Sequence, residues 1–482
     1  MTDAGAHLLV DGRFIDETGS TLDVINPSTG GLVRSVPLGG LTEVDAAITA
    51  ARRAFDDGQW SGLAPRHRAE ILLRLADLVD AHTADFTHLV ETEVGTCRLV
   101  AEAGQVRRPM EHYRDMVAKG SAELGYSLPD LPGPPPTAQH VVREPWGVVA
   151  AITPWNAPHF LNLWKLAPAL VVGNTMVLKP APEAPSSALL LGELAVEAGI
   201  PPGVLNVITG GADVGHVMVS DPRVDMVTFT GSSAVGRVIA QSAATTFKHV
   251  LLELGGKSAL LALPDADVPS LLTAVMRFVT MAGQGCGLLT RVVVPDALHD
   301  KVVAGLVGAV GRVQVGPADD PSATMGPVIS AAALDRIGAA VRGAVVAGAR
   351  IACGGGYPAN VPAGGFYFEP TILTEVNNDM PVAREEIFGP VVCVIRYNGD
   401  PDEGVRIVND SPYGLLAAVW TADTELGLRL AAHIRAGQVR VNATASGSEA
   451  PFGGYKQSGI GREVGHEGVC EYTTVKYVAW QQ

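Results

Sequence analysis

Residues 226–257 read MVTFTGSSAVGRVIAQSAATTFKHVLLELGGK. Two short apolar runs, 226–229 and 250–252, flank a Gly-Ser turn and a segment long enough for a helix. Parallel strands need a connection of this length, whereas antiparallel strands can be joined by a short turn. The stretch therefore predicts two parallel strands joined by a helix.

The same alternation extends on both sides of this unit. Val- and Ile-rich runs at 147–152, 175–178 and 204–208 are separated mostly by helix-length segments, and a second α/β stretch runs from about 258 to 433. Such a pattern predicts an α/β fold with a doubly wound parallel sheet and helices on both faces. Sheets of this kind bind ligands beyond the carboxyl ends of their strands.

The regions outside the strand–helix alternation show other sequence patterns. Apolar residues at helical spacing in 44–55 and 71–79 predict two amphipathic helices. The segment PDLPGPPP at 129–136 excludes regular helix and a central strand, so it marks a boundary or an arm. The tail at 471–480, EYTTVKYVAW, has strand propensity and is expected to pair with another segment or subunit.

Composition limits the classes of function. The 482 residues include 35 Lys and Arg against 50 Asp and Glu, for a net charge of −15, which argues against nucleic-acid or anionic-membrane partners. No apolar run approaches the ~18–20 residues of a membrane helix, and no secretory signal is visible. Five cysteines are too few for a disulfide framework, so we expect a cytoplasmic protein. The length predicts about three domains. Scattered histidines without C-x-x-C spacing predict no metal site.

Polar residues follow four of the expected strands. Asn156, Lys179, the Gly231-Ser232 turn and Glu253 should converge on one edge of the sheet. Gly-Ser at a helix N-terminus suits a phosphate, but it is equally ordinary capping chemistry. The chain lacks G-x-G-x-x-G, and GIGREVG at 459–465 has the wrong spacing and is interpreted as a Gly-rich turn.

One cysteine differs from the others in its setting. Cys286 lies within GQGCG, where neighbouring glycines allow backbone amides and a substrate to approach the thiol. From this setting alone, a reactive thiol and a small buried hydrophobe are both open interpretations. The remaining cysteines are interpreted as inert buried side chains: Cys97, Cys353, Cys393 and Cys470.

Taken in order, these motifs resemble the NAD(P)-dependent aldehyde dehydrogenase superfamily. The resemblance runs from NPSTG at 26–30 to YTTVK at 472–476. The motifs that carry it are PWN (154–156), LKP (178–180), FTGS (229–232), ELGGK (253–257), GQGC (283–286), EEIFGP (385–390) and PFGGYKQSG (451–459).

The resemblance implies a three-part organisation. A cofactor-binding domain would comprise 1–119 and 142–253, and a catalytic domain 254–452. Residues 120–141 and 453–482 would form a small β oligomerisation arm of a homodimer or homotetramer.

It also implies roles for individual residues. Cys286 would attack the aldehyde, the Asn156 amide and the Cys286 N–H would hold the oxyanion, and Glu253 would activate the water that hydrolyses the thioester. Lys165 would relay the proton, although a solvated helix lysine is an equal alternative. The substrate pocket would include Ala157, Phe160, Leu161 and Trp164.

For the cofactor, Lys179 would contact the adenosine ribose, Ser232 the pyrophosphate and Glu386 the nicotinamide ribose. Trp155 and Phe388 would line the cleft, with plain core packing as the alternative. Pro182 occupies the position where many NAD-preferring members carry a glutamate, so NAD is expected and NADP stays open. The full implied set is Ile152, Thr153, Trp155, Lys179, Gly231, Ser232, Gly236, Leu254, Gly255, Glu386 and Phe388.

The aldehyde side departs from several members. The segment ATASGSEA at 443–450 is small and polar where those members carry aromatics, which predicts a wide pocket for medium-chain, aromatic or terpenoid aldehydes. Two other functions are weighed. A CoA-acylating semialdehyde dehydrogenase would generally lack Glu253, and a non-catalytic relative would be expected to lose Cys286, Glu253 or Asn156.

Overall fold

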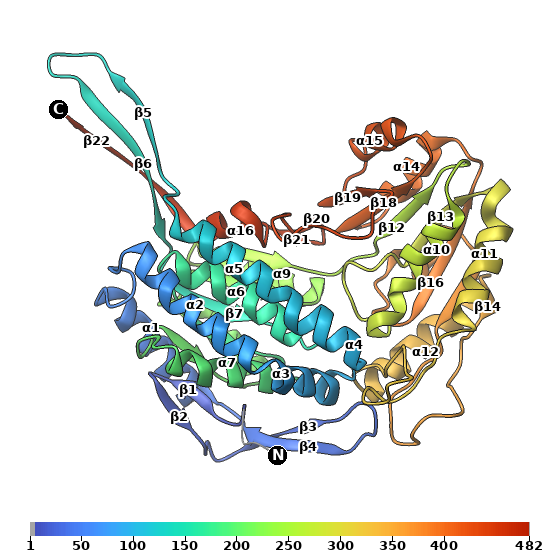
Figure 1. Cartoon of the computed structure of the whole chain (residues 1–482), viewed down its shortest axis with the longest axis horizontal. Coiled ribbons are helices and arrows are strands. Elements are labelled where there is room, and N and C mark those ends of the chain that lie inside the picture. Colours follow the sequence, from blue (N-terminus) through green and yellow to red (C-terminus); the bar gives the residue numbers. More distant parts are fainter. Residues whose placement is uncertain (1–4, 482) are drawn as a thin grey trace.

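The computed structural model describes residues 5–481 and contains two large sheets with helices on both faces of each (Figure 1). The first sheet has five central parallel strands with antiparallel strands at its edges. Its order is β2 (Arg13–Ile15), β1 (Leu8–Val10), β9 (Leu205–Val207), β8 (Thr175–Lys179), β7 (Val148–Ile152), β10 (Met226–Thr230), β11 (His249–Glu253) and β21 (Gly459–Ile460). The predicted α/β fold with a doubly wound parallel sheet is confirmed.

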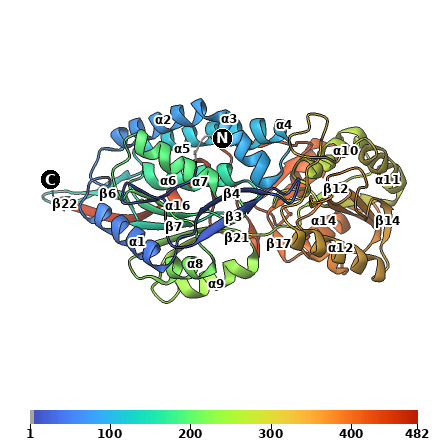
Figure 2. The ribbon, with the colours of Figure 1, turned by 90° about the horizontal axis from the view of Figure 1, so that it is seen from below.

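Two layers of helices cover this sheet, as Figure 2 shows edge-on. One layer packs on the strand residues represented by Val149 and Met176, and the other on those represented by Val148 and Val177. Successive side chains of each strand point to opposite faces of the sheet, so each strand contributes to two separate hydrophobic cores. The first layer comprises α2 (Pro65–Ala81), α5 (Arg108–Ser121), α6 (Pro158–Val171) and α7 (Ser186–Glu197); the second comprises α1 (Leu41–Asp56), α8 (Ala212–Ser220) and α9 (Ser233–Ala243).

The second sheet extends beyond the expected stretch, because its last strand ends at residue 441. Helices again cover both faces and enclose two further cores. Its strand order is β14 (Arg350–Cys353), β15 (Thr371–Val376), β16 (Val391–Tyr397), β13 (Arg291–Pro295), β12 (Ala259–Ala262), β18 (Leu416–Trp420) and β19 (Gln438–Val441). The helices are α10 (Val268–Met276), α11 (Asp296–Val310), α12 (Ala331–Val346), α13 (Pro381–Arg384), α14 (Pro401–Asn409) and α15 (Thr424–Ala431).

A three-stranded arm projects from the body of the molecule (Figure 1). It consists of β5 (Tyr126–Leu131), β6 (Thr137–Pro145) and the tail strand β22 (Thr473–Gln481), with β6 in the middle. The expected pairing of the tail is confirmed, although α16 (Gly465–Glu471) precedes the strand. Pro129 lies in the edge strand β5, next to a register irregularity, which agrees with the exclusion of a central strand.

The interpretation of 459–465 as a turn alone was incomplete. Gly459–Ile460 forms β21, which pairs antiparallel with β11 at the edge of the first sheet. Gly459, Gly461 and Gly465 have φ values of 140°, 85° and 67°, so the segment bends as glycines allow. Two adjacent residues are too short a run for the periodic pattern that reveals a strand.

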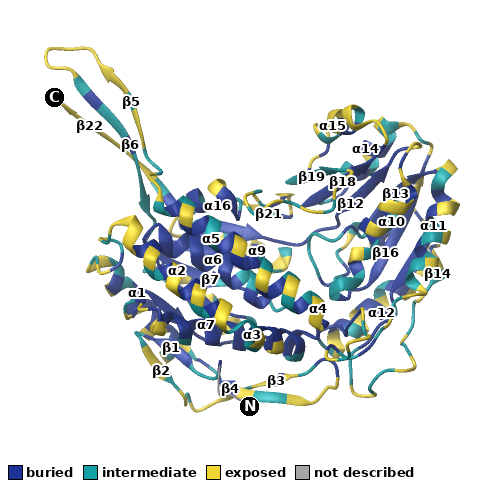
Figure 3. Ribbon diagram, in the orientation of Figure 1, coloured by how far each residue is buried: buried dark blue, intermediate teal, exposed yellow. Residues whose placement is uncertain are grey.

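The remaining elements are short. They are β3 (Thr21–Ile25), β4 (Leu32–Pro37), α3 (Thr83–Leu89), α4 (Arg98–Val100), β17 (Tyr413–Gly414), β20 (Tyr455–Lys456), two π-helical segments (Val90–Val94 and Ala101–Arg107) and a 3-10 segment (Arg277–Met281). Figure 3 shows that strands of both large sheets are buried while the arm is largely exposed. Within residues 5–481, no helix is long and apolar enough to cross a membrane, and no group of three or more His, Cys, Asp or Glu could hold a metal ion.

Candidate active site

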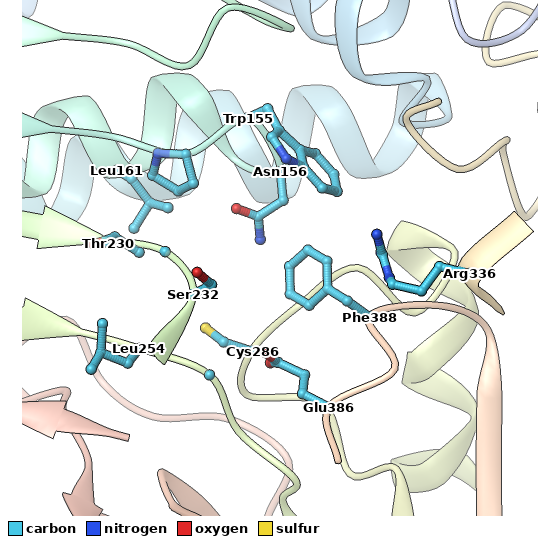
Figure 4. A pocket seen from close by; sticks show the side chains of 13 residues that line it. Trp155, Asn156, Leu161, Thr230, Ser232, Leu254, Cys286, Arg336, Glu386 and Phe388 are labelled. Carbon is cyan, nitrogen blue, oxygen red and sulfur yellow. The ribbon is translucent and has the colours of Figure 1, made fainter. Parts of the chain in front are cut away.

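A cavity of about 370 Å³ contains the thiol singled out in the sequence. Residues that follow β7, β10 and β11 form one part of its wall, while Cys286 and Glu386 come from the second half of the chain. Figure 4 shows the Cys286 sulfur among side chains from all these segments. The lining residues are Pro154, Trp155, Asn156, Leu161, Thr230, Gly231, Ser232, Leu254, Gly255, Cys286, Arg336, Glu386 and Phe388.

Cys286 is partly exposed and lies in a closely packed glycine loop. Gly283 adopts φ 73°, and a Cβ there would collide with the Gly389 backbone. A Cβ on Gly256 would lie only 2.6 Å from the Cys286 carbonyl oxygen. Burial raises the pKa of the Cys286 thiol, and the carboxylates of Glu253 and Glu386 raise it further. The resting group is therefore a thiol, and its attack requires transfer of a proton to a base.

Asn156 is held in place beside the cysteine. Its Nδ2 donates to the backbone carbonyl oxygen of Gln284 at 2.9 Å. The side-chain amide of Gln105 donates to the backbone carbonyl oxygen of Asn156 at 3.3 Å. A side-chain amide nitrogen carries two protons, so one N–H is left for a ligand. Asn156 is thus oriented to donate to a developing negative charge in the cavity.

Glu253 ends β11 and is buried. Neither carboxyl oxygen has a hydrogen-bond partner. Burial raises the pKa of Glu253 well above its usual value, and Glu463 raises it further, while Lys165 and Arg462 oppose the shift. Unpartnered buried carboxyls are costly, and one whose charge acts on a reactive thiol is a candidate for a chemical role. Glu253 does not itself line the cavity, although its charge acts on Cys286.

Lys165 and Glu463 form a fully buried ion pair next to Glu253. The Lys165 Nζ lies 2.6 Å from the Glu463 Oε1 and 3.1 Å from the Thr228 Oγ1. The alternative of a solvated helix lysine is therefore wrong. Glu463 was missed because it lies in 459–465, where the local pattern carries no sign of burial. Its partner is 298 residues away in the sequence.

A second cavity, of about 430 Å³, lies beyond the same edge of the first sheet. Lys179 and Ile152 line it from strand ends, and Pro182, at the position discussed above, lines it as well. The Lys179 ammonium donates to the Gly210 and Pro180 carbonyl oxygens at 2.9 and 3.2 Å, which leaves one N–H for a ligand. Burial lowers the pKa of Lys179 to about 8.

Glu386 faces the first cavity from the second half of the chain. Its Oε1 accepts from the Gly256 N–H at 2.9 Å, and burial raises its pKa to about 6. A Cβ on Gly255 would lie 2.4 Å from the other carboxyl oxygen, so glycine leaves room for Glu386 in this position. Phe388 and Trp155 contact edge-to-face at 5.4 Å and line the cavity, and Trp155 also packs against two hydrophobic cores.

The other predicted cofactor residues take different places. Gly231, Ser232 and Leu254 line the first cavity, and the Ser232 hydroxyl caps α9 by accepting from the Val235 N–H. Gly236 is a packing position, because a Cβ there would collide with Leu254. Thr153 is buried and donates to Asn162 at 2.7 Å, and it lines neither cavity. Arg336 lines the first cavity, although nothing in the sequence marked it.

A third cavity, of about 270 Å³, is lined by two of the four residues predicted for the substrate pocket, Phe160 and Trp164. Phe160, Trp164 and Phe452 form an aromatic wall, with ring centroids 4.6 Å apart for the first pair and 5.4 Å for the second. Residues 444–447 supply the small wall expected from the sequence. Leu161 lines the first cavity instead. Ala157 caps α6 and lines neither cavity.

Comparison with known proteins agrees with this geometry. Residues 14–478 match the Aldehyde dehydrogenase family. The chain is 38% identical over 483 residues to the geranial dehydrogenase of Castellaniella defragrans, covering 99% of both. A point mutant of betaine aldehyde dehydrogenase from Staphylococcus aureus, solved in complex with NAD+, superposes with a TM-score of 0.96 at 34% identity, covering 99% of this chain and 98% of that one.

An Escherichia coli NADP-dependent enzyme is a further structural neighbour, with a TM-score of 0.94 at 35% identity and coverage of 99% and 98%. The sequence profile, the curated relative and the solved structures thus agree over nearly the whole length. The chain belongs to the aldehyde dehydrogenase family.

Proposed function

We propose that this protein oxidises an aldehyde to the carboxylic acid with a nicotinamide dinucleotide as hydride acceptor. The reaction would proceed through a thioester on Cys286 that water hydrolyses. The observation that carries the proposal is the grouping of Cys286, Asn156 and Glu386 around one cavity, with Glu253 buried beside it.

The two cavities along the first sheet fit a dinucleotide. The second cavity combines apolar side chains with the free N–H of Lys179, which suits an adenosine. Val235 and Val238 are 47% and 58% exposed there, as expected for side chains that a ligand covers. The N-terminus of α9 at Ser232 favours a pyrophosphate, and the Glu386 carboxylate suits ribose hydroxyls. Bound in this way, the cofactor supplies a ring that accepts a hydride.

The attack step uses groups that the chain itself supplies. The Cys286 thiol first gives its proton to solvent water, and the thiolate sulfur then adds to the aldehyde carbon as the C=O π electrons move to oxygen, which becomes an oxyanion. The free N–H of Asn156 and the backbone N–H of Cys286 donate to that oxygen. Loss of a hydride from the resulting thiohemiacetal leaves the acyl group on Cys286 as a thioester.

Hydrolysis then requires a base. Glu253 takes a proton from water as the water oxygen adds to the thioester carbon, and Cys286 leaves as the acid is released. The raised pKa of Glu253 suits a base that must accept a proton near neutral pH. The Lys165–Glu463 pair lies next to Glu253 and is the group that would pass this proton onward.

The cofactor is proposed to be NAD+, with NADP+ also accepted. Pro182 supplies no carboxylate to bind the adenosine ribose hydroxyls or to repel a 2′-phosphate. One structural neighbour is a complex with NAD+ and another is named an NADP-dependent enzyme. Initial rates of cofactor reduction with each dinucleotide test the assignment, and an absolute requirement for NADP+ would contradict it.

The aldehyde is proposed to be medium-chain, aromatic or terpenoid in size. The aromatic wall and the small residues at 444–447 support this, as does the 38% identity to a geranial dehydrogenase. A panel graded in length and ring content provides the test. The largest kcat/KM with acetaldehyde would contradict the proposal.

We further propose a homo-oligomer, a dimer or a tetramer, held through the arm in 120–141 and 453–482. Its strands expose large apolar side chains, and both edge strands are open to pairing with another copy. The exposed apolar residues are Tyr126, Leu131, Val475, Tyr477, Val478 and Trp480. Light scattering after gel filtration should give at least twice the chain mass, and removal of residues 473–482 should reduce it.

The proposed compartment is the cytoplasm, and the cysteines support it. All five are free thiols, which suits a reducing environment.

The two other proposed domains are the cofactor-binding part, 1–119 with 142–253, and the catalytic part, 254–452. The two large sheets support that division.

A further inference from the structure

Three arginines line the aldehyde cavity, and they come from three separate segments. Arg108 begins α5, Arg277 begins the 3-10 segment and Arg440 lies in β19. His112 lines the same cavity, whereas no Asp or Glu does. The concentration of positive charge contrasts with the chain as a whole, whose net charge is −15.

These arginines lack anionic partners. Within residues 5–481, no carboxylate lies within ion-pair distance of any of the three, whereas Arg114 and Arg223 each contact two. Their acceptors are neutral oxygens: Ser446 O for Arg108 at 3.0 Å, Thr444 O for Arg440 and Arg277 at 2.9 and 3.4 Å, and Gln438 Oε1 for Arg440 at 3.3 Å.

The cluster is under electrostatic stress. The Arg440 Nε is buried without a hydrogen-bond partner. Burial lowers the pKa of Arg440, and the charges of Arg277 and Arg108 lower it further. Like charges held together without a counter-ion cost free energy, which an anion between them would recover. The cluster therefore has the charge and the free donors that suit an anion.

The cavity adjoins the reacting thiol. The Phe452 ring, part of the aromatic wall, lies 3.9 Å from where a Cβ would be on Gly287, the residue after Cys286. Gln105 lines the cavity and donates to the backbone of Asn156. A molecule whose carbonyl lies at Cys286 would thus extend along the aromatic wall toward the arginines.

We infer that the aldehyde substrate carries a carboxylate at the end remote from its carbonyl, and that Arg108, Arg277 and Arg440 bind this carboxylate. The inference rests on the proposed aldehyde oxidation and narrows its substrate class. A guanidinium presents paired N–H donors that match a carboxylate. Phe160, Trp164 and Phe452 contact the apolar body between the two polar ends. The substrate is therefore an ω-carboxy aldehyde with an aliphatic or aromatic spacer.

Matched pairs of substrates test this directly on the full-length enzyme. 4-Carboxybenzaldehyde is compared with its methyl ester, and aliphatic ω-carboxy aldehydes of about six to eight carbons with theirs. Loss of charge-assisted hydrogen bonds lowers binding by about 10- to 100-fold, so kcat/KM for the acids should exceed that for the esters by this factor, mainly through KM.

Two variants and a control localise the effect. In Arg440→Gln and Arg108→Gln the acid-to-ester ratio of kcat/KM should fall toward one. Arg312→Gln is the matched control, since this arginine is exposed, lies outside the cavity lining and donates to the Gly308 carbonyl oxygen of its own turn. The control should keep the wild-type ratio.

A measurement without variants covers the case in which they fold poorly. Raising the ionic strength from about 0.05 M to about 0.5 M should lower kcat/KM for the acids and leave the esters unchanged, because salt screens only the charged pair. Esters oxidised as well as the acids, with no salt effect, would overturn the inference while leaving aldehyde oxidation intact. No oxidation of either would contradict the proposed function itself.

Discussion

The cavity that contains Cys286 and the cavity that contains the three arginines adjoin each other, yet they are built in different ways. Much of the first is formed by residues directly after β7, β10 and β11, so the topology of one sheet places them. The arginine cavity is lined by residues of α5, α6, the 3-10 segment, β19 and the loop after β19. In the proposed mechanism, the reaction thus depends on the order of strands, while the proposed selectivity depends on side chains from scattered segments.

The difference has a measurable consequence. Substitutions at the Cys286 cavity should lower the rate for every aldehyde by the same factor. Substitutions at the arginine cavity should change the rate in a way that depends on the substrate. Rates with a small neutral aldehyde and with a bulky or charged one therefore distinguish the two regions.

The largest effect is expected from Cys286→Ala. Without the sulfur no thioester forms, so the rate should fall by about 10⁴-fold or more for all aldehydes. Cofactor reduction followed by absorbance measures it. Cys353→Ala, a half-buried thiol in β14, serves as the control and should keep its activity. Retained oxidation in Cys286→Ala would refute the mechanism.

Asn156→Ala removes one donor to the oxyanion. Loss of such a donor typically costs about 10²- to 10³-fold, and the loss should appear in kcat equally for neutral and carboxylated aldehydes. Asn398→Ala, at an exposed position, is the matched control. An effect confined to one substrate class would show that Asn156 determines selectivity, which would contradict the division of roles between the two cavities.

Ala445→Phe should affect only the arginine cavity, and not the cavity that contains Cys286. Ala445 lines the aldehyde cavity and is exposed at it, so a phenyl ring there should narrow the passage without disturbing the core. We expect kcat/KM to fall by about 10-fold for bulky aromatic aldehydes and to stay constant for acetaldehyde, because only the bulky substrate meets the added volume. Equal losses for both would contradict the separation.

The smallest effect concerns pH. Cys286 and Glu253 both have raised pKa values and both must lose a proton to react, so kcat should rise from pH 7 to pH 9 for every aldehyde. The pKa of Lys179 is lowered to about 8, so above that pH its charge is lost and the KM for the cofactor should increase. A kcat that stays constant across this range would show that both groups are already ionised at pH 7 and would contradict the raised pKa values.

The same contrast explains what the sequence could predict. The strand-end pattern identified Asn156, because a parallel sheet brings its carboxyl ends to one edge. The glycine setting singled out Cys286, and the family resemblance implied Glu386. Glu463 escaped because its burial depends on a partner 298 residues away. The arginine cluster escaped for a related reason: Arg108, Arg277 and Arg440 become neighbours only in the folded chain.

The central claim is that Cys286 carries the acyl group and Glu253 directs its hydrolysis. Glu253→Gln keeps the shape of the side chain but removes the base, which should slow hydrolysis by about 10²- to 10⁴-fold. Glu385→Gln, an exposed carboxylate beside Glu386, is the control.

The most direct test is mass spectrometry of Glu253→Gln after mixing with aldehyde and NAD+. The account predicts a burst of about one NADH per site and the mass of the acyl group on the peptide that contains Cys286. Absence of the burst, or an acyl group on any other residue, would contradict it.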